Sequence, residues 1–245
     1  MSLELFELKP GALLIADAHY SDQRPKLIEL LQSVYDGNTT ASQLILMGDI
    51  FDLLFGPIAL TYERNKEAIE IINAIAMKIE VLYLEGNHDF LLKRYFPEIY
   101  LVPLSSQPLH VRFKDQDILL AHGDFGSHLK YRLYTMLIRS RMVLSLLNVL
   151  DWVSAHRIIH YLDDYLEKKD DCYKIEAFED LVKERLEIHS LLDYDGIIEG
   201  HFHQNTKFDF NGFNYINLAA FACNERYFVV KSSQEALELE EFRLR

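Results

Sequence analysis

The chain has 245 residues, which is enough for one large domain with a single core or for two small domains. Apolar residues make up 49% of it and charged residues 26%, which is ordinary for a soluble globular protein. The net charge of −13 and the isoelectric point near 5.2 argue against a nucleic-acid binder, which would need a basic face for the phosphate backbone.

The cysteine content and the hydropathy pattern bear on the cell compartment. Cys172 and Cys223 are the only cysteines, so we expect no disulfide framework and a reducing compartment. Residues 1–11 lack the long apolar core of a signal peptide, and no uncharged apolar run approaches the roughly 18 residues of a membrane span. The sequence therefore predicts a cytoplasmic protein that can lie on a membrane without crossing it. Nothing in it indicates an obligate protein partner.

The N-terminal part of the chain alternates short apolar runs with helical patterns. Strands are predicted at 12–16, 44–47 and 79–84, and helices at 25–35 and 62–77. Because strands that alternate with helices form βαβ units, this part of the chain predicts a largely parallel sheet.

After Pro108 the pattern changes to short strands. Residues 110–113 and 118–121 flank a polar tetrapeptide, which predicts a β-hairpin. Near the end of the chain we expect short antiparallel strands at 197–199, 207–210, 215–218, 227–230 and 237–242. The predicted fold class is therefore α/β with a mixed, α+β-like second half.

The stretch between these two regions is helical by its periodicity. Apolar residues recur at steps of three and four between residues 129 and 147, and two further helical patterns follow before residue 192. We interpret residues 1–126 and 193–245 as the core of the protein and residues 127–192 as a helical insertion that caps a site.

Five short polar segments each follow a predicted strand. They are Asp17-Ala18-His19, Gly48-Asp49-Ile50-Phe51-Asp52, Gly86-Asn87-His88-Asp89, His122-Gly123-Asp124 and Gly200-His201-Phe202-His203. Because ligands of open α/β sheets lie beyond the carboxyl ends of the strands, segments that are far apart in the sequence can converge there.

The residue types in these segments are those of a metal site. Carboxylate, carboxamide and imidazole groups are ligands for Mn²⁺, Fe²⁺ and Zn²⁺. Side chains at i and i+2 of an extended strand end share a face, so Asp17 and His19 can reach one ion. Each segment alone would more often be a turn, a helix cap or a buried histidine. Together and in this order they predict a binuclear site formed by Asp17, His19, Asp49, Asn87, His122, His201 and His203.

The order D-x-H, G-D-x-x-D, G-N-H-D, H-G-D and G-H-x-H resembles the motifs of the calcineurin-like metallophosphoesterases. The resemblance implies a four-layer αββα sandwich, in which helices flank two mixed sheets. It also implies that two metal ions are bridged by Asp49. The implied ligands are Asp17, His19 and His203 for the first ion and Asn87, His122 and His201 for the second.

Two catalytic residues are expected beside the metal ligands. The resemblance implies that His88 is the cationic or acidic group facing the phosphate and that Asp52 is its orienting carboxylate. Because His88 adjoins Asn87, it must lie near the substrate, where an imidazolium can stabilise developing charge or protonate the departing oxygen. Two closely spaced cations lower the pKa of a shared water and clamp the phosphoryl oxygens.

Residues 86–92 and 94–96 extend the resemblance to one group within that family, the UDP-2,3-diacylglucosamine pyrophosphatases of lipid A synthesis. Those enzymes release UMP, leave lipid X, usually use Mn²⁺ and hold acyl chains in a helical insertion. The resemblance implies the same pyrophosphate cleavage, two Mn²⁺ ions and a peripheral position on the cytoplasmic face of the inner membrane. Fe²⁺ and Zn²⁺ also suit these ligands.

This chain departs from that group at several positions. The best-known members have Arg in place of His88, Glu in place of Asp52, Leu in place of Ala18, and a different sequence after His201. The His88–Asp52 pair is closer to the wider family. A metal-dependent phosphodiesterase or phosphoprotein phosphatase with a soluble substrate is therefore the alternative. A scaffold without catalytic activity is disfavoured because no ligand is missing.

The predicted insertion has its own charge pattern. Residues 125–162 contain five basic residues and one acid, so this stretch carries +4 while the rest of the chain carries −17. A basic, leucine-rich stretch with Trp152 can lie on anionic lipid or bind a nucleotide pyrophosphate. The alternative is an amphipathic helix whose arginines face solvent. The candidate substrate-binding residues are Arg132, Arg139, Arg141 and Arg157.

Two further observations concern the surroundings of these motifs. His156 and His160 have the spacing of helical zinc ligands, but Arg157 stands where the catalytic Glu would be, so we expect a structural role for both histidines. Asp89 and Asp124 adjoin predicted ligands and are expected to support them by hydrogen bonds.

Overall fold

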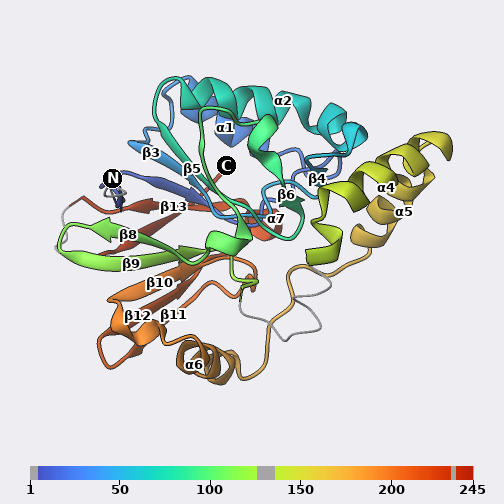
Figure 1. Cartoon of the computed structure of the whole chain (residues 1–245). Coiled ribbons are helices and arrows are strands. Elements are labelled where there is room, and N and C mark those ends of the chain that lie inside the picture. The colour runs from blue at the N-terminus through green and yellow to red at the C-terminus, as the bar shows by residue number, and fades with distance from the viewer. Residues whose placement is uncertain (1–4, 126–135, 233–235, 245) are drawn as a thin grey trace.

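The structure is a computed structural model that describes residues 5–125, 136–232 and 236–244. Two six-stranded sheets face each other, and helices cover the outer face of each sheet (Figure 1). The layers follow the order helix, sheet, sheet, helix. This arrangement confirms the predicted αββα sandwich.

The first sheet contains the predicted βαβ units. Its strands in spatial order are β14 (Leu239–Arg243), β13 (Arg226–Val230), β2 (Leu13–Ile15), β3 (Gln43–Leu46), β5 (Glu80–Leu84) and β7 (Tyr100–Val102). The strands β2, β3 and β5 are parallel, as the sequence pattern predicted. The strand β7, which was not predicted, extends this parallel set, and β13 joins β2 antiparallel. Helices α1 (Leu27–Tyr35) and α2 (Ala59–Ala76) cover its outer face.

The second sheet is built from later strands and the N-terminal strand. Its strands in spatial order are β1 (Phe6–Glu7), β8 (Leu109–Phe113), β9 (Gln116–Ala121), β10 (Gly196–Glu199), β12 (Phe213–Asn217) and β11 (Thr206–Phe210). The predicted hairpin is confirmed as β8 and β9. The expected antiparallel orientation is wrong for β10, which runs parallel to both β9 and β12. Parallel neighbours need a long crossover connection, and the helices between β9 and β10 provide it.

Apolar side chains fill the space between the sheets and the space under the outer helices. Between the sheets, Leu14 and Ile45 meet Ile118 and Ile198 in one buried cluster. The outer face of the second sheet is covered by α6 (Phe178–Ile188) (Figure 1). Helix α6 falls within the predicted insertion, residues 127–192, yet it packs on the core sheet. The division into core and insertion otherwise stays a prediction.

Helices α4 (Arg141–Val153) and α5 (Arg157–Leu166) extend from one end of the sandwich, near the short paired strands β4 (Leu54–Phe55) and β6 (Asp89–Phe90) (Figure 1). The two helices meet at an angle of 104°. Among the described residues no single helix has both the length and the apolar composition of a membrane span, although α4 and α5 taken together do.

The corner between α4 and α5 is fixed by the buried carboxylate of Asp151. One of its oxygens accepts a hydrogen bond from the Ile159 backbone N–H (3.0 Å), and the other lies 2.7 Å from Nδ1 of His156. His160 contacts Arg64 of α2 at 3.1 Å. Both histidines therefore hold the helices in place, as expected.

The structure corrects the expectation about the cysteines. Cys172 and Cys223 form a disulfide, with 5.8 Å between their Cα atoms, although they are 51 residues apart in the sequence. Cys172 lies between α5 and α6, and Cys223 lies in the short helix α7 (Phe221–Asn224). Spatial proximity of this kind depends on the tertiary fold, which the spacing of two cysteines does not reveal.

The remaining elements are the 3₁₀ helices η1 (Leu92–Arg94), η2 (Leu104–Ser106) and η3 (Leu191–Asp193).

Candidate metal centre

The five polar segments converge at one edge of the sandwich. They follow the carboxyl ends of β2, β3 and β5 in the first sheet and of β9 and β10 in the second. Backbone hydrogen bonds join neighbouring loops, with the Asp17 N–H donating to Gly48 O (3.2 Å) and the His19 N–H donating to Asp49 O (3.0 Å). Both sheets therefore contribute side chains to the same place, as the strand-end positions predicted.

The backbone of this region is unusually strained. Residues with positive φ are uncommon outside glycine, and clusters of them mark functional sites. Two of the glycines serve a related purpose: a Cβ at Gly86 would come within 2.2 Å of Asp49 Oδ1, and one at Gly200 within 2.4 Å of Asp17 Oδ2. The predicted ligands in the left-handed region are Asp17, His19, Asp49, His201 and His203.

The first group of ligand atoms contains Asp17, His19 and His203, whose side-chain donor atoms lie within 4.8 Å of one another. His203 Nε2 is 3.1 Å from Asp17 Oδ1. The His201 backbone N–H donates to both oxygens of Asp17, at 3.0 and 2.9 Å. All three side chains come from two loops that lie on different sheets.

The second group contains Asp49, His122 and His201, again within 4.8 Å. His122 Nε2 lies 3.3 Å from Asp49 Oδ2 and 3.2 Å from Asn87 Oδ1. His122 Nδ1 donates to Met47 O at 3.1 Å, so its Nε2 is the ring atom that faces the other donors and that would bind a cation. The structure thus brings all seven predicted ligands together.

The donor set fits divalent cations. His19 Nδ1 donates to the Asp52 carboxylate (3.2 Å), while His19 Nε2 is buried and has no hydrogen-bond partner. A buried polar atom is normally satisfied, and an imidazole nitrogen left with its lone pair exposed to carboxylates is suited to a cation. Three largely buried carboxylate–imidazole groups occur among residues 5–125, 136–232 and 236–244, and the third contains His19, Asp52 and His88.

The charges of this group shift the histidine pKa values in opposite directions. Burial lowers the pKa of His203, but the Asp17 carboxylate raises it more, to about 9. Burial likewise opposes protonation of His122, but the Asp49 carboxylate holds its pKa well above the usual value. Burial and the neighbouring His122 lower the pKa of His201 to about 3. Without a cation, two of these imidazoles hold protons that neutralise the carboxylates.

Asp89 supports the loop that carries Asp49. Its carboxylate accepts hydrogen bonds from the backbone N–H groups of residues 49, 50 and 51 (3.1, 2.6 and 3.2 Å), from Gly86 N–H (2.9 Å) and from the Tyr83 hydroxyl (2.6 Å). Burial raises its pKa to about 7, and the negative charge of Asp49 adds to this effect. The structure therefore places Asp89 where it supports the centre, as the sequence suggested.

His88 and Asp52 are in contact, but the contact does not involve the Asp52 carboxylate, which was expected to orient His88. His88 Nδ1 donates to the backbone carbonyl of Asp52 at 2.9 Å, whereas the Asp52 carboxylate is 4.0 Å away and bonds His19 instead. Asp52 thus positions His88 through its main chain. Burial lowers the pKa of His88, so the neutral ring is its resting form.

Several residues that hold the loops were not found from the sequence. Gln107 accepts the His122 backbone N–H (2.7 Å) and donates to Glu85 O (2.7 Å). Asn217 donates to Gly200 O (2.6 Å) and accepts the Gln204 N–H (2.7 Å). A buried polar residue within an apolar strand, as at Asn217, is the one signal that could have revealed them.

The four candidate arginines lie in different surroundings. Arg139 is half-buried; its Nη2 donates to Gly86 O (2.8 Å) and to the Asp124 carboxylate (3.2 Å), so it adjoins the second group. Arg141 and Arg157 are exposed on α4 and α5. Arg132 lies outside the described residues.

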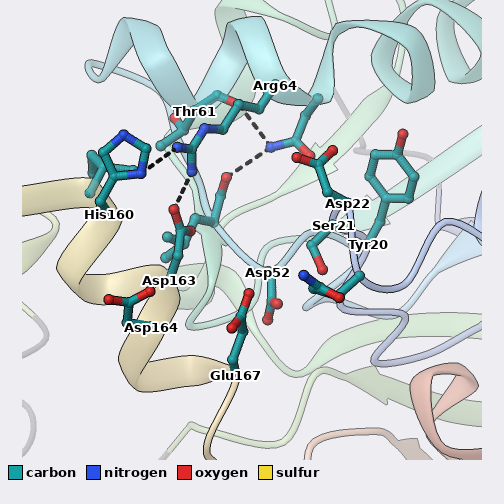
Figure 2. A pocket seen from close by; sticks show the side chains of 14 residues that line it. Tyr20, Ser21, Asp22, Asp52, Thr61, Arg64, His160, Asp163, Asp164 and Glu167 are labelled. Atoms are coloured by element: carbon teal, nitrogen blue, oxygen red, sulfur yellow. Dashed lines mark hydrogen bonds and ion pairs between the residues drawn. The ribbon is translucent and has the colours of Figure 1, made fainter. Parts of the chain in front are cut away.

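Two cavities adjoin the candidate metal centre. One, of about 290 Å³, lies beside Asp52 and between α2 and α5; Figure 2 shows the carboxylates of Asp22, Asp163 and Glu167 around it and Arg64 bonded to Asp163 and His160. The other, of about 690 Å³, is lined by the charged side chains of Arg139, Asp124 and Glu85 among others. Its apolar lining consists of Leu91, Pro103, Leu104, Pro108, Phe125, Met136 and Leu191.

The fold and the paired ligand groups are those of a metallophosphoesterase. The chain belongs to the calcineurin-like phosphoesterase family, whose profile it matches over residues 12–205. Family and ligand groups together imply divalent metal ions.

Similar proteins include bacterial relatives with one shared name. The chain is 27% identical over 156 residues to a UDP-2,3-diacylglucosamine hydrolase of Pseudomonas fluorescens, covering 61% of this chain and 62% of the relative. It is 30% identical over 117 residues to the protein of the same name from Wigglesworthia glossinidia brevipalpis, covering 46% of each. These matches span about half to three-fifths of the relatives. A solved archaeal phosphodiesterase is 14% identical, with a TM-score of 0.47 over 94% of this chain and 99% of the other.

Metal binding should strengthen as the pH rises from about 6 to 9. The proton that Asp17 holds on His203, whose pKa is about 9, must leave before Nε2 can bind a cation. Below that pKa, each pH unit should weaken binding at one site by up to about ten-fold, because a single proton competes. Calorimetric titration of the metal-free protein with Mn²⁺, in buffers of different ionisation enthalpy, measures both the affinity and the protons released.

A histidine outside the centre provides the control. His110 pairs with Asp117 in an exposed position, so His110→Ala should keep the same pH dependence. An affinity that does not change between about pH 6 and 9, with no proton release, would contradict the role given to His203.

Proposed function

We propose that this protein hydrolyses the pyrophosphate bond of UDP-2,3-diacylglucosamine, releasing UMP and leaving a diacylglucosamine 1-phosphate. The observation that carries the proposal is the convergence of seven carboxylate, amide and imidazole side chains into two adjoining groups at one edge of the sandwich. The shared name of the bacterial relatives supports the substrate.

The two groups would each hold one divalent cation. Asp49 would bridge the ions, because its carboxylate contacts His122 and is influenced by the charges of both His88 and His19. We propose Mn²⁺, and Fe²⁺ and Zn²⁺ suit the same donors. Such ions supply a Lewis-acid clamp for the phosphoryl oxygens and an activated water. The proposed ligands are Asp17, His19 and His203 for one ion and Asn87, His122 and His201 for the other.

His88 would face the substrate. Its Nδ1 is held by the Asp52 carbonyl, so Nε2 is the atom left for a phosphate oxygen. The lowered pKa of His88 makes Nε2 an acceptor in the resting protein. The doubly charged pyrophosphate of the substrate, placed beside the ring, would favour protonation of the ring, and the imidazolium could then stabilise developing charge or protonate the departing oxygen.

The two cavities offer different surroundings to the two sides of a pyrophosphate substrate. The cavity beside Asp52 is rich in carboxylates, which repel a second phosphate and suit neutral hydroxyl groups such as those of a sugar. The larger cavity combines seven apolar side chains with the guanidinium of Arg139 and the carboxylates of Glu85 and Asp124. We propose that acyl chains lie against its apolar lining and that Arg139 lies near a phosphate. Arg139 is thus the predicted arginine that the geometry favours for substrate contact.

The α4–α5 pair would dock on a membrane that carries anionic lipid. Apolar side chains are exposed along α4, including Met142 (81% exposed) and Trp152 (70%). The exposed Arg141 and Arg157 lie on the same pair of helices, and such a combination of apolar and basic side chains binds anionic bilayers. We therefore propose that the protein acts at the cytoplasmic face of the inner membrane, where its lipid substrate would lie.

Substitutions at Asp52 and His88 should have separable effects. Because the Asp52 carboxylate bonds ligand His19, Asp52→Ala should weaken metal binding by roughly 10–100-fold, as loss of such a supporting group usually does. His88→Ala should lower kcat by roughly 10²–10⁴ while both metal ions stay bound. Metal analysis of the dialysed variants, together with steady-state kinetics, measures both effects. Full turnover by His88→Ala would remove that residue from the mechanism.

The substrate can be tested directly. For purified protein with Mn²⁺, we expect kcat/KM for release of UMP from UDP-2,3-diacylglucosamine to be at least tenfold higher than kcat/KM for cleavage of an aryl phosphodiester. The reason is that the apolar cavity should favour the lipid by about 1.4 kcal/mol or more. The products are separated by chromatography. Hydrolysis of the aryl ester without hydrolysis of the lipid would favour the alternative, a phosphodiesterase with a soluble substrate.

Membrane docking can be followed through the only tryptophan of the chain, Trp152. Vesicles of phosphatidylglycerol and phosphatidylethanolamine should shift its emission to shorter wavelength, and added salt should reverse part of the shift. Met142→Asp should abolish the shift. Met77→Asp, at a side chain that is 78% exposed at the end of α2, is the matched control and should leave it unchanged. Equal vesicle binding by both variants would reject docking through α4.

A further inference from the structure

The segment between α5 and α6 returns to the candidate metal centre and contacts one of the ligands. His203 Nδ1 donates a hydrogen bond to the backbone carbonyl of Asp171. A carbonyl can only accept, so this contact places the ring hydrogen on Nδ1 and leaves Nε2 to face Asp17 Oδ1, 3.1 Å away. A main-chain atom of this segment therefore sets both the tautomer and the orientation of a ligand that belongs to the core.

Asp171 is itself held on the core by charge. Its side chain is buried (6% exposed), and Oδ2 lies 2.8 Å from Nη1 of Arg24, which comes from the loop before α1. Lys169 Nζ is 3.4 Å from the other carboxylate oxygen. A buried ion pair with good geometry fixes the position of its backbone better than an exposed one does.

The next residue forms the disulfide that joins this segment to α7. The first N–H groups of α7 donate to the two residues at the end of β2: the Phe221 N–H to Ala16 O (2.9 Å) and the Ala222 N–H to Asp17 O (3.1 Å). The cross-link between Cys172 and Cys223 thus connects the carbonyl that orients His203 to the short helix that holds the main chain of Asp17. His203 and Asp17 belong to the same ligand group.

We propose that Asp171 is a positioning residue for the first metal site and that the Cys172–Cys223 disulfide makes the affinity of this site depend on redox state. The proposal rests on the proposed function, in which Asp17, His19 and His203 hold one cation. With the disulfide closed, the Asp171 carbonyl stays on His203. With it open, only non-covalent contacts hold the segment against the core: the Arg24 ion pair of Asp171 and the hydrogen bonds that Lys174 and Ile175 donate to Gln204.

The switching reaction is an ordinary thiol–disulfide exchange. A dithiol reductant gives up two electrons and two protons: its two sulfurs become bonded to each other, the Cys172–Cys223 bond breaks, and both cysteines become thiols. Cys172 is exposed, so the reductant can reach it. The second group of ligands, around His122, makes no contact with this segment among the hydrogen bonds of the described residues, so its affinity serves as an internal reference.

The experiment measures the affinity of each site for Mn²⁺ in both redox states. Metal-free, full-length protein is oxidised, and one half is reduced with a phosphine that is then removed under nitrogen. Calorimetric titration should show one site weakened by roughly 10–100-fold after reduction, the usual effect of losing a partner that orients a ligand, and the other changed by less than about two-fold. Reoxidation should restore the first value.

Variants separate the cross-link from other effects of the reductant. The double variant Cys172→Ser/Cys223→Ser should show the weakened site in both conditions. Arg24→Ala, which removes the 2.8 Å ion pair of Asp171, should enlarge the difference between the oxidised and reduced protein. Lys26→Ala removes an exposed charge nearby and is the matched control, for which the difference should equal that of the wild type.

Three results would overturn the proposal. Affinities that agree within about two-fold between oxidised and reduced protein would show that the cross-link does not act on the site. Two free thiols after oxidation, detected by mass spectrometry of alkylated protein, would show that the bond does not form. Equal weakening of both sites would indicate general loosening of the fold. Absence of Mn²⁺ binding in either redox state would instead reject the proposed function, on which this inference rests.

Discussion

The central constraint on this structure is the burial of carboxylates at the edge where the two sheets meet. Asp17 and Asp49 are both almost completely buried, and a buried anion is costly unless positive charge or hydrogen-bond donors surround it. The surrounding loops provide both: strained backbone that directs N–H groups at the carboxylates, and imidazoles that carry protons or leave room for cations. The positive φ angles, the close glycines and the shifted pKa values all follow from satisfying these two groups.

The supporting residues extend this arrangement outward. The Asp89 carboxylate accepts hydrogen bonds from N–H groups of the Asp49 loop, and Asn217 donates to the Gly200 carbonyl in the loop of His201. Arg185 of α6 donates to Gly123 O (2.8 Å) and to the buried Glu199 (2.9 Å), so this helix contributes to the same edge while it covers the second sheet. The outer helices therefore do more than shield apolar faces, because they fix the loops that carry the site.

The sequence predicted the features that depend on local pattern and missed the features that depend on contacts between distant parts of the chain. Strands near 12–16, 44–47 and 79–84 were found because apolar runs and helical periodicity are local. The convergence of the seven predicted ligands was found because each follows a strand. The parallel orientation of β10 was missed, since a short strand does not reveal its partners. The Cys172–Cys223 bond was missed because the spacing of two cysteines does not show that they meet in the fold. The contact of the Asp52 carbonyl with His88 was missed because main-chain contacts leave no trace in residue types.

The division of ligands between the two sheets has a consequence for handling the protein. Of the proposed ligands, Asp17, His19, Asp49 and Asn87 follow strands of the first sheet, and His122, His201 and His203 follow strands of the second. An ion held by either group would therefore join the halves of the sandwich. Ions that bind only the folded chain stabilise it by mass action, by about 2.7 kcal/mol when free metal is one hundred times the dissociation constant. Chelators in a purification buffer would thus remove the ions that join the two sheets, and the melting temperature of the protein would rise and fall with the metal content of the solution.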